Sequence, residues 1–303
     1  MAVYTKAILF YNKKSGHSTD QKLQIIKAHF QSRHIDLEIV EVPKPQHEIN
    51  EIVSQGISKG FDLVVAVGGD GTVSLVSDAL VGTSIPLGIL PLGTGNLFAK
   101  EVKIPMNLQK ALETITRDSP NITKLDTFHL DGRHYILNLS VGVSPKLMSL
   151  TLQEEKQRFG VFAYIIHFLQ QLLGLELHWF EIEYDHHHLS TYASEILITN
   201  SRTIGIESLK WSNIVSLNDG KLDLFIFRAR NMFDIIGLLI SIFRKKEIGP
   251  VIKFIQFEEY CRIESRTVMN TQADGDIVGQ TPIKIHIDPN SLNVITGTLN
   301  IYQ

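Results

Sequence analysis

Short apolar runs alternate with helix-patterned runs from residue 6 to residue 125. This alternation is typical of βαβ units stacked around a parallel sheet. The pattern predicts four strands, at Lys6–Tyr11, Ile35–Val42, Phe61–Val67 and Ile85–Leu90. A predicted helix follows each strand after a short loop, at Asp20–Arg33, Glu48–Lys59, Val73–Leu80 and from Leu97 onward. We therefore expect residues 1–125 to form an α/β domain.

Two of these strands differ in the burial that their sequences indicate. The run FDLVVAV, residues 61–67, is almost entirely apolar and rich in β-branched residues, as expected of a strand covered on both faces. The run IDLEIVEV, residues 35–42, alternates apolar and charged positions. The first run is predicted to be central in the sheet, and the second to lie nearer an edge.

After Lys124 the chain changes to alternating, β-branched runs separated by turn signals. The runs occupy residues 127–130, 133–139, 175–184, 193–200, 221–229, 257–265 and 282–288, and helical patterns interrupt them near 158–174 and 232–246. Asp131-Gly132, between the first two runs, predicts a tight hairpin turn. Residues 126–303 are predicted to form a second, mostly antiparallel domain. The sequence leaves open whether the last strand returns to the first domain.

The composition narrows the classes of partner. The chain has 303 residues, of which 44% are hydrophobic, and this length suits two domains that each bury a core. Its net charge of −3 and scattered basic residues supply no positive field for nucleic acid, which is not an expected partner. The one cysteine, Cys261, cannot form an internal disulfide, which is compatible with a reducing compartment and makes the cytoplasm the expected location. Whether the chain forms a homo-oligomer stays open.

No segment is predicted to cross a membrane. The apolar start of the chain lacks the long apolar core of a signal peptide, and the runs 161–175 and 235–243 fall short of the roughly 20 residues that a spanning helix needs. Residues 232–254 combine an apolar helical face with Arg244, Lys245 and Lys246. This segment is compatible both with peripheral contact to an anionic membrane surface and with an ordinary packed helix.

The segment Gly68–Thr72 reads GGDGT and stands between a buried strand and a helix. Its glycines let the backbone turn sharply and present N–H groups, and the following helix adds its positive end. The segment predicts an anion-binding loop, although a plain tight turn is the alternative. Asp70 is informative because a carboxylate facing phosphates needs a divalent cation between them or a proton to accept. Its alternative role is to cap the next helix through Thr72 or Val73.

Two further strand ends carry similar loops. Pro91–Asn96 reads PLGTGN and supplies Gly93, Thr94 and Asn96, of which Asn96 can cap the next helix or bind a ligand. The first strand ends in NKKSG, residues 12–16, with an amide, two cations, a hydroxyl and a glycine. Side by side, these loops predict one phosphate-binding site.

In this order, NKKSG, GGDGT, PLGTGN and the late acidic segment DGD at Asp274–Asp276 resemble the diacylglycerol kinase catalytic domain superfamily, which includes bacterial lipid kinases and sphingosine and ceramide kinases. The resemblance covers nearly the whole chain. It implies a Rossmann-like α/β nucleotide domain with a parallel sheet, followed by an antiparallel β-sandwich domain, with ATP and Mg²⁺ as cofactors. It also implies a lipid substrate taken from a membrane surface.

The resemblance also implies roles for individual residues. ATP binding falls to the first three loops, at Asn12, Ser15, Gly16, Gly68, Gly69, Gly71, Thr72, Gly93, Thr94 and Asn96. Catalytic roles fall to Asp70, to Asp126 of a polar network, and to Asp276 as the general base for the lipid hydroxyl. Strand-edge and hairpin-turn carboxylates are the alternatives for Asp126 and Asp276. A supporting Mg²⁺ site falls to Ser216, Asp219 and the carbonyl of Lys221, with a simple turn as the alternative.

Several positions depart from the family pattern. Ser74 and Leu75 follow the GGDGT loop where Asn and an acidic residue are common, and Leu97 replaces an Asp of bacterial diacylglycerol kinases. Pro43 stands at the place of a nucleotide-contacting Thr, and Asp276 at that of a Glu. The sequence therefore predicts an ATP-dependent lipid kinase acting on diacylglycerol or a related long-chain alcohol. A soluble metabolite kinase related to NAD kinases and an inactive nucleotide-binding homologue remain the alternatives.

Overall fold

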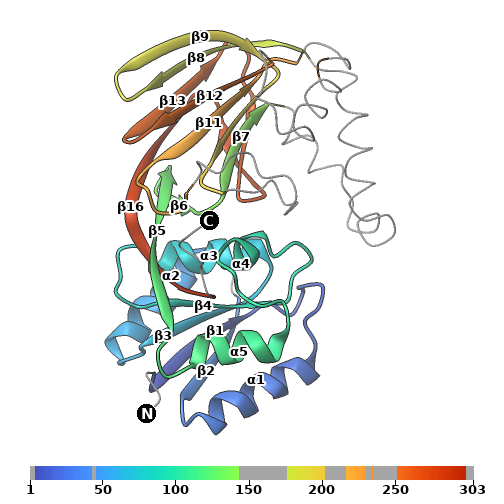
Figure 1. The fold of residues 1–303 in the computed structure, drawn as a ribbon, viewed down its shortest axis with the longest axis vertical. Coiled ribbons are helices and arrows are strands. Elements are labelled where there is room, and N and C mark those ends of the chain that lie inside the picture. Colours follow the sequence, from blue (N-terminus) through green and yellow to red (C-terminus); the bar gives the residue numbers. More distant parts are fainter. Residues whose placement is uncertain are drawn as a thin grey trace. The chain divides into compact units, whose positions relative to one another are not determined.

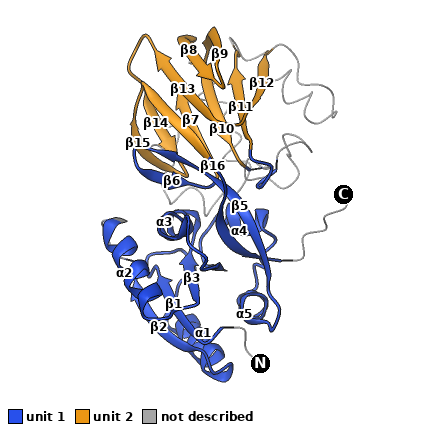
Figure 2. Ribbon diagram, turned by 90° about the vertical axis from the view of Figure 1, so that its left-hand side faces the viewer, with its two compact units in different colours: residues 1–136, 201–220, 288–303 blue, residues 137–200, 221–287 orange. Residues whose placement is uncertain are grey.

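The structure is a computed structural model that describes residues 4–42, 46–142, 176–201, 216–229, 234 and 251–297. The chain folds into two compact units, coloured separately in Figure 2. Unit 1 contains residues 1–136, 201–220 and 288–303, and unit 2 contains residues 137–200 and 221–287. Each unit is therefore assembled from segments that are separated in the sequence. The sequence patterns predict a boundary after residue 125 and leave open a return of the last strand.

Unit 1 is an α/β unit whose elements follow one another in the order expected of βαβ units. They are β1 (Lys6–Tyr11), α1 (Asp20–Ser32), β2 (Asp36–Glu41), α2 (Gln46–Ser58), β3 (Leu63–Gly68), α3 (Asp70–Leu80), β4 (Leu87–Pro91), α4 (Leu97–Glu101), α5 (Leu108–Thr116), β5 (Asn121–Leu130) and β6 (Arg133–Tyr135). The first four strands form a parallel sheet in the order β2-β1-β3-β4. The predicted parallel α/β fold is confirmed.

Right-handed crossovers decide which face each helix covers. The connection from β1 to β2 runs in one direction along the sheet, and those from β2 to β3 and from β3 to β4 run in the other. α1 is therefore expected opposite α2 and α3, and Figure 1 shows α1 with α5 on one face and α2 with α3 on the other. Every residue of β3 is buried, whereas β2 lies at the edge with Asp36, Glu38 and Glu41 exposed. This confirms the central and edge positions predicted from their sequences.

Unit 2 is built from antiparallel strands. They are β7 (Asn138–Gly142), β8 (His178–Tyr184), β9 (His187–Ala193), β10 (Glu195–Thr199), β11 (Leu222–Phe227), β12 (Ile252–Phe257), β13 (Tyr260–Ser265), β14 (Asn270–Ala273), β15 (Asp276–Gln280) and the start of β16 (Ile283–Thr296). One sheet has the order β12-β11-β10-β7-β14-β15, and the start of β16 continues into β13, β8 and β9. Buried side chains include Phe180, Ile196, Leu224 and Ile263. The predicted antiparallel sandwich-like domain is confirmed.

The predicted run 133–139 is two strands and not one. β6 ends at Tyr135 in unit 1, and β7 begins at Asn138 in unit 2. The N–H groups of Leu137 and Asn138 both donate to Asp274 Oδ1, so the backbone leaves one ladder here and joins another. The predicted hairpin turn before β6 is confirmed, because Asp131 and Gly132 have φ values of 51° and 79°, as tight hairpin turns require.

The long strand β16 starts in unit 2 and ends in unit 1. Its first residues pair with β13, and Val294 pairs with Leu87 of β4 in the parallel sense. The last strand thus returns to the α/β sheet, a point that the sequence leaves open. The helical patterns near 158–174 and 232–246 fall outside the described residues except for Asp234, and so do Arg244, Lys245 and Lys246. In the described part of the chain, no helix has the length and apolar character needed to cross a membrane.

Candidate phosphate-binding site

Three loops of unit 1 meet at the carboxyl edge of the parallel sheet. β1, β3 and β4 are neighbours in the sheet, so the loops that follow them leave from the same edge. The N–H of Asn12 donates to the carbonyl of Val67 at 3.0 Å, and the N–H of Leu92 donates to the carbonyl of Gly68 at 2.9 Å. Ser15 Oγ donates to the Leu92 carbonyl at 2.7 Å. The structure thus brings the three predicted loops together.

Glycine is required where the second and third loops touch. A Cβ on Gly93 would overlap with the Cα of Gly69, and a Cβ on Gly69 would lie 3.2 Å from the Cα of Gly93. A Cβ on Gly16 would come within 3.1 Å of Thr94 Oγ1, so the first loop also runs close to the third. At Gly71, by contrast, a Cβ would have no atom within 4 Å. The loops are close-packed against one another but open at Gly71, where a ligand can approach the backbone.

Asp70 connects the second loop to the third. Its Oδ1 accepts a hydrogen bond of 3.0 Å from the N–H of Phe98 in the first turn of α4. It does not cap its own helix, because the N–H groups of Thr72 and Val73 donate to the carbonyl of Gly69 instead. Among the described residues, no hydrogen bond reaches Asp70 Oδ2. One oxygen therefore fixes the side chain, while the other is available to a ligand.

The amide side chains of the site shape its loops. Asn96 is buried, has φ 52° and ψ 45°, and pairs with the backbone of Gly93 through both of its amide atoms, at 2.9 and 2.8 Å. It therefore makes no side-chain cap for α4. Asn12 Nδ2 donates to Thr72 Oγ1 at 2.9 Å, and Asn12 Oδ1 accepts from the N–H of Lys14 at 3.0 Å. These bonds hold the first loop against the start of α3.

Asp126 is buried and holds two segments that are distant from it in the sequence. Only 1% of it is exposed, and its two carboxylate oxygens accept from the N–H groups of Gly220 and Asn290, each at 2.7 Å. Its own N–H donates to the carbonyl of Leu217 at 2.8 Å. Asp126 thus connects β5 to the turn at residues 217–220 and to Asn290 of β16.

The segment predicted to bind a supporting Mg²⁺ forms a turn. Ser216 Oγ donates to Asn218 Oδ1 at 3.0 Å, and Gly220 adopts a φ of 73°. The ammonium group of Lys221 pairs with Glu258 at 2.7 Å. The turn that Asp126 fastens includes Asp219. These contacts agree with the turn interpretation, and the metal-binding role of Ser216, Asp219 and Lys221 stays a prediction.

The two acidic residues of the DGD segment have different surroundings within unit 2. The segment forms the hairpin between β14 and β15, with φ values of 48° at Asp274 and 98° at Gly275. Asp274 is 8% exposed and accepts hydrogen bonds from the N–H groups of Leu137 and Asn138 at 2.9 and 3.1 Å. Asp276 is exposed at the start of β15. Of the two, only Asp276 presents its carboxylate to solvent.

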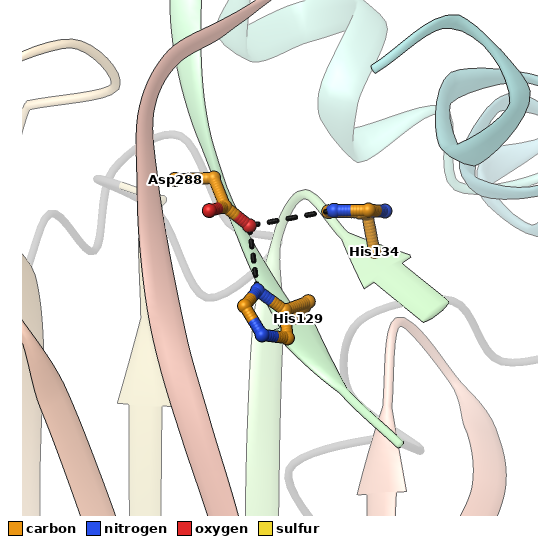
Figure 3. Close-up of side chains that lie close together, drawn as sticks. All are labelled: His129, His134 and Asp288. Carbon is orange, nitrogen blue, oxygen red and sulfur yellow. Dashed lines mark hydrogen bonds and ion pairs between the residues drawn. The ribbon is translucent and has the colours of Figure 1, made fainter. Parts of the chain in front are cut away.

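A second cluster in unit 1 was not foreseen from the sequence. His129 and His134 face one carboxylate oxygen of Asp288, Oδ2 (Figure 3). His134 also contacts Asp78 of α3. A signal for this cluster exists in the sequence. In a tight hairpin around Asp131-Gly132, residues 129 and 134 stand directly opposite each other, and they do so in the structure.

The fold and the loops together define a class, an α/β unit with a glycine-rich loop site combined with an antiparallel β unit. The structure resembles a crystal structure described as "a putative diacylglycerol kinase" from Bacillus anthracis, with a TM-score of 0.80 and 23% identity over 97% of this chain and 96% of that chain. The sequence matches the diacylglycerol kinase catalytic domain family over residues 6–128 and the YegS C-terminal NAD kinase beta sandwich-like domain over residues 139–296. The chain belongs to the diacylglycerol kinase catalytic domain family with the YegS C-terminal domain.

Two relatives that match almost the whole of this chain support this membership. A Synechocystis protein described as uncharacterized is 30% identical over 96% of this chain and 70% of its own length. A Staphylococcus aureus protein named "Putative lipid kinase" is 26% identical over 97% of both chains. The similarity to these relatives covers both units.

Proposed function

We propose that this protein is an ATP-dependent kinase that transfers the γ-phosphate of ATP to the hydroxyl group of a lipid. The observation that carries the proposal is the position of Asp70, held among three glycine-containing loops with Oδ2 available to a ligand. The family membership and the name of the Staphylococcus aureus relative support the same class of reaction. The proposed substrate is diacylglycerol or a related long-chain lipid alcohol.

The loops are suited to the phosphates of ATP. α3 points its N-terminus at the loop junction, and its positive end favours anions there. Gly71 leaves the backbone open to approach, and the exposed Lys14 adds a positive charge to the first loop. Thr94 is exposed on the third loop and offers a hydroxyl. These groups are the ones that we expect to bind the phosphate oxygens.

Asp70 has two possible tasks in the transfer. Mg²⁺ bound with ATP would neutralise the negative charge of the phosphates. Asp70 Oδ2 can hold such a cation, or it can accept the proton of the lipid hydroxyl as that oxygen attacks the phosphate. The hydrogen bond from Phe98 to Oδ1 restricts the side chain, so that Oδ2 keeps a fixed direction for either task.

A catalytically inactive nucleotide-binding protein is the second candidate, and one observation favours it. Leu97 is the first residue of α4, directly before the Phe98 that holds Asp70. Its apolar side chain can neither bind a cation nor move a proton. If the reaction needs a second carboxylate at this place, the phosphates would bind without being transferred.

The experiment that separates these candidates uses radiolabelled ATP. The purified full chain is incubated with γ-labelled ATP, Mg²⁺ and a mixed lipid extract, and in parallel with NAD. We expect label on a lipid with the wild type and none with Asp70→Asn. Label on NAD would identify a metabolite kinase instead, and ATP binding without a labelled product in either reaction would support the inactive homologue.

If the substrate is a lipid, the kinase should act at a membrane surface. Activity on vesicles should rise with the fraction of anionic lipid and fall with added salt. The reason is that Arg244, Lys245 and Lys246, within the segment 232–254, would be attracted to the negative surface. Flotation with vesicles measures the binding directly. Activity that ignores salt, together with no flotation, would contradict peripheral membrane binding.

A further inference from the structure

Unit 1 contains a cluster of metal-ligating side chains that the kinase reaction does not use. We propose that His129, His134 and Asp288 form a binding site for a zinc-like divalent transition metal, in which Asp78 orients His134. Their ligand atoms all lie within 4.8 Å of one another, and this is the one such group of three His, Cys, Asp or Glu residues in the part of the chain that is described. Figure 3 shows the two imidazole rings converging on the carboxylate.

Both distances to Asp288 are close to those around a small ion, and the two ring nitrogens, which lie no more than 4.8 Å apart, can approach to the same spacing by movement of the side chains. His129 Nδ1 lies 2.7 Å and His134 Nε2 lies 3.4 Å from Asp288 Oδ2. Ligands about 2.0–2.1 Å from a tetrahedral zinc ion stand roughly 3.3 Å from one another. The contact of His134 already has this spacing, and the contact of His129 would have to open by less than about 1 Å.

Asp78 gives His134 the orientation that a metal ligand needs. Its Oδ1 lies 3.0 Å from His134 Nδ1 and also accepts a hydrogen bond of 2.8 Å from the N–H of His134. The Asp78 side chain is 6% exposed, so a hydrogen on Nδ1 is fixed by a buried carboxylate. The lone pair of the neutral ring is then on Nε2, on the side of Asp288. Carboxylates arranged in this way behind histidine ligands are general in metal sites.

The ligands come from a rigid frame. His129 and His134 pair across the β5–β6 hairpin, and Asp288 belongs to β16. The Asp288 carbonyl accepts a hydrogen bond from Ser291 Oγ at 2.7 Å, and that hydroxyl lies 2.8 Å from Thr127 Oγ1 of β5. The backbone positions of the three ligands are therefore set before a metal arrives.

Exposure and ligand type indicate which ion would bind. The side chains of His129, His134 and Asp288 are 37%, 27% and 34% exposed, which leaves an entry path and room for a water ligand. Two imidazoles and a carboxylate favour zinc, copper, nickel or iron over Mg²⁺, which prefers oxygen ligands. Asp78 lies eight residues after Asp70, about 12 Å along α3. The cluster is therefore separate from a Mg²⁺ bound with ATP.

The test is a Zn²⁺ titration of the chelator-treated full chain, followed by competition with a coloured chelator. His186 and His188 are changed to Gln in every sample, because exposed neighbouring histidines bind zinc weakly by themselves. We expect one equivalent of tight binding, and a loss of at least 100-fold in affinity in His129→Gln/His134→Gln. The exposed His47→Gln of α2 is the matched control and should bind like the parent. Equal affinity of the parent and the double variant overturns the proposal.

Two further measurements protect this result against misfolding. Circular dichroism of the metal-free variants shows whether they are folded, and the single variant His129→Gln, at the most exposed ligand, repeats the test with the smallest disturbance. Co²⁺ should give visible absorption bands with the parent that disappear in His129→Gln. Asp78→Asn should weaken Zn²⁺ binding by about 10- to 100-fold without removing it. The proposal is overturned if the parent shows no Co²⁺ bands and if Zn²⁺ does not change its melting temperature. The histidines and carboxylates would then be joined only by hydrogen bonds.

Discussion

The glycine loop of unit 1 and the acidic hairpin of unit 2 place aspartates beside glycines in different ways. In the loop, one residue is both fixed by the backbone and available to a ligand. Asp70 Oδ1 accepts the N–H of Phe98, while Oδ2 has no hydrogen bond from a described residue. In the hairpin the two tasks fall on different residues. Asp274 is buried and accepts two backbone N–H groups, and Asp276 is exposed on the next strand. A carboxylate that is positioned by backbone and still available is the better candidate for chemistry.

The largest effect is expected at the loop. Asp70→Asn should reduce lipid phosphorylation to the background of the assay, because it removes the negative charge that holds a cation or accepts a proton. Stability should change little, since the Asn side-chain oxygen can still accept from the N–H of Phe98. Labelled-ATP turnover and thermal melting are measured together. Near-normal turnover of Asp70→Asn would show that Asp70 only connects its loop to α4 and takes no part in the transfer.

The next effect is expected at the exposed acid of the hairpin. If Asp276 is the general base, Asp276→Asn should lower turnover by about 10²- to 10⁴-fold with ATP affinity almost unchanged. Asp276→Glu keeps the charge and lengthens the reach by one methylene group, so it tests whether the position of the carboxylate limits the rate. Full activity of Asp276→Asn would assign the base role to Asp70, and a collapse of ATP binding would assign Asp276 to the metal or to the fold.

The buried acid of the same hairpin should affect stability. Asp274→Ala leaves the N–H groups of Leu137 and Asn138 without their acceptor, and we expect a loss of about 2–4 kcal/mol in the free energy of unfolding. Asp276→Ala is the matched control and should change stability by less than about 0.5 kcal/mol, because that side chain is exposed. Urea unfolding of both variants measures the difference. Equal losses of stability in the two variants would contradict the assignment of the structural role to Asp274 alone.

The sequence predicts the meeting of the three loops well because its signals are local. Three glycine-containing loops at the ends of adjacent parallel strands must meet, and the apolar run 61–67 identifies the central strand. The division of the chain is harder to predict. β7 separates from β6 through bonds to Asp274, which is more than 130 residues away in the sequence, and no local pattern contains that pairing.

The hydrogen-bond partners of individual side chains also could not be predicted from local sequence patterns. The alternative role of Asp70, a cap on its own helix, is not adopted, and its hydrogen bond reaches Phe98, 28 residues later. The histidine cluster combines a predictable pair, His129 and His134, with Asp78 and Asp288 from distant elements. A sequence pattern fixes which residues share a hairpin or an edge, whereas hydrogen bonds between elements need the folded chain.

The smallest effect is expected at a third kind of carboxylate, Glu195 at the start of β10, for which the described residues supply no hydrogen-bond donor. Burial raises the pKa of Glu195 to about 8, far above the ordinary value of 4.5. The folded chain therefore keeps a proton that the unfolded chain releases near pH 4.5, and stability falls as pH rises from that value to about 8. Glu195→Gln removes this dependence because its side chain stays neutral.

We therefore expect Glu195→Gln to match the parent near pH 4.5 and to exceed it by about 1–2 kcal/mol at pH 8. The full pKa difference corresponds to more, but Glu195 is partly exposed, and water reduces the penalty for its charge. Urea unfolding at several pH values measures the difference, with an unchanged m-value as the check that the same surface is exposed. A stability advantage independent of pH would come from packing. A disadvantage above pH 7 would mean that a cation or a hydrogen-bond donor stabilises the ionised Glu195.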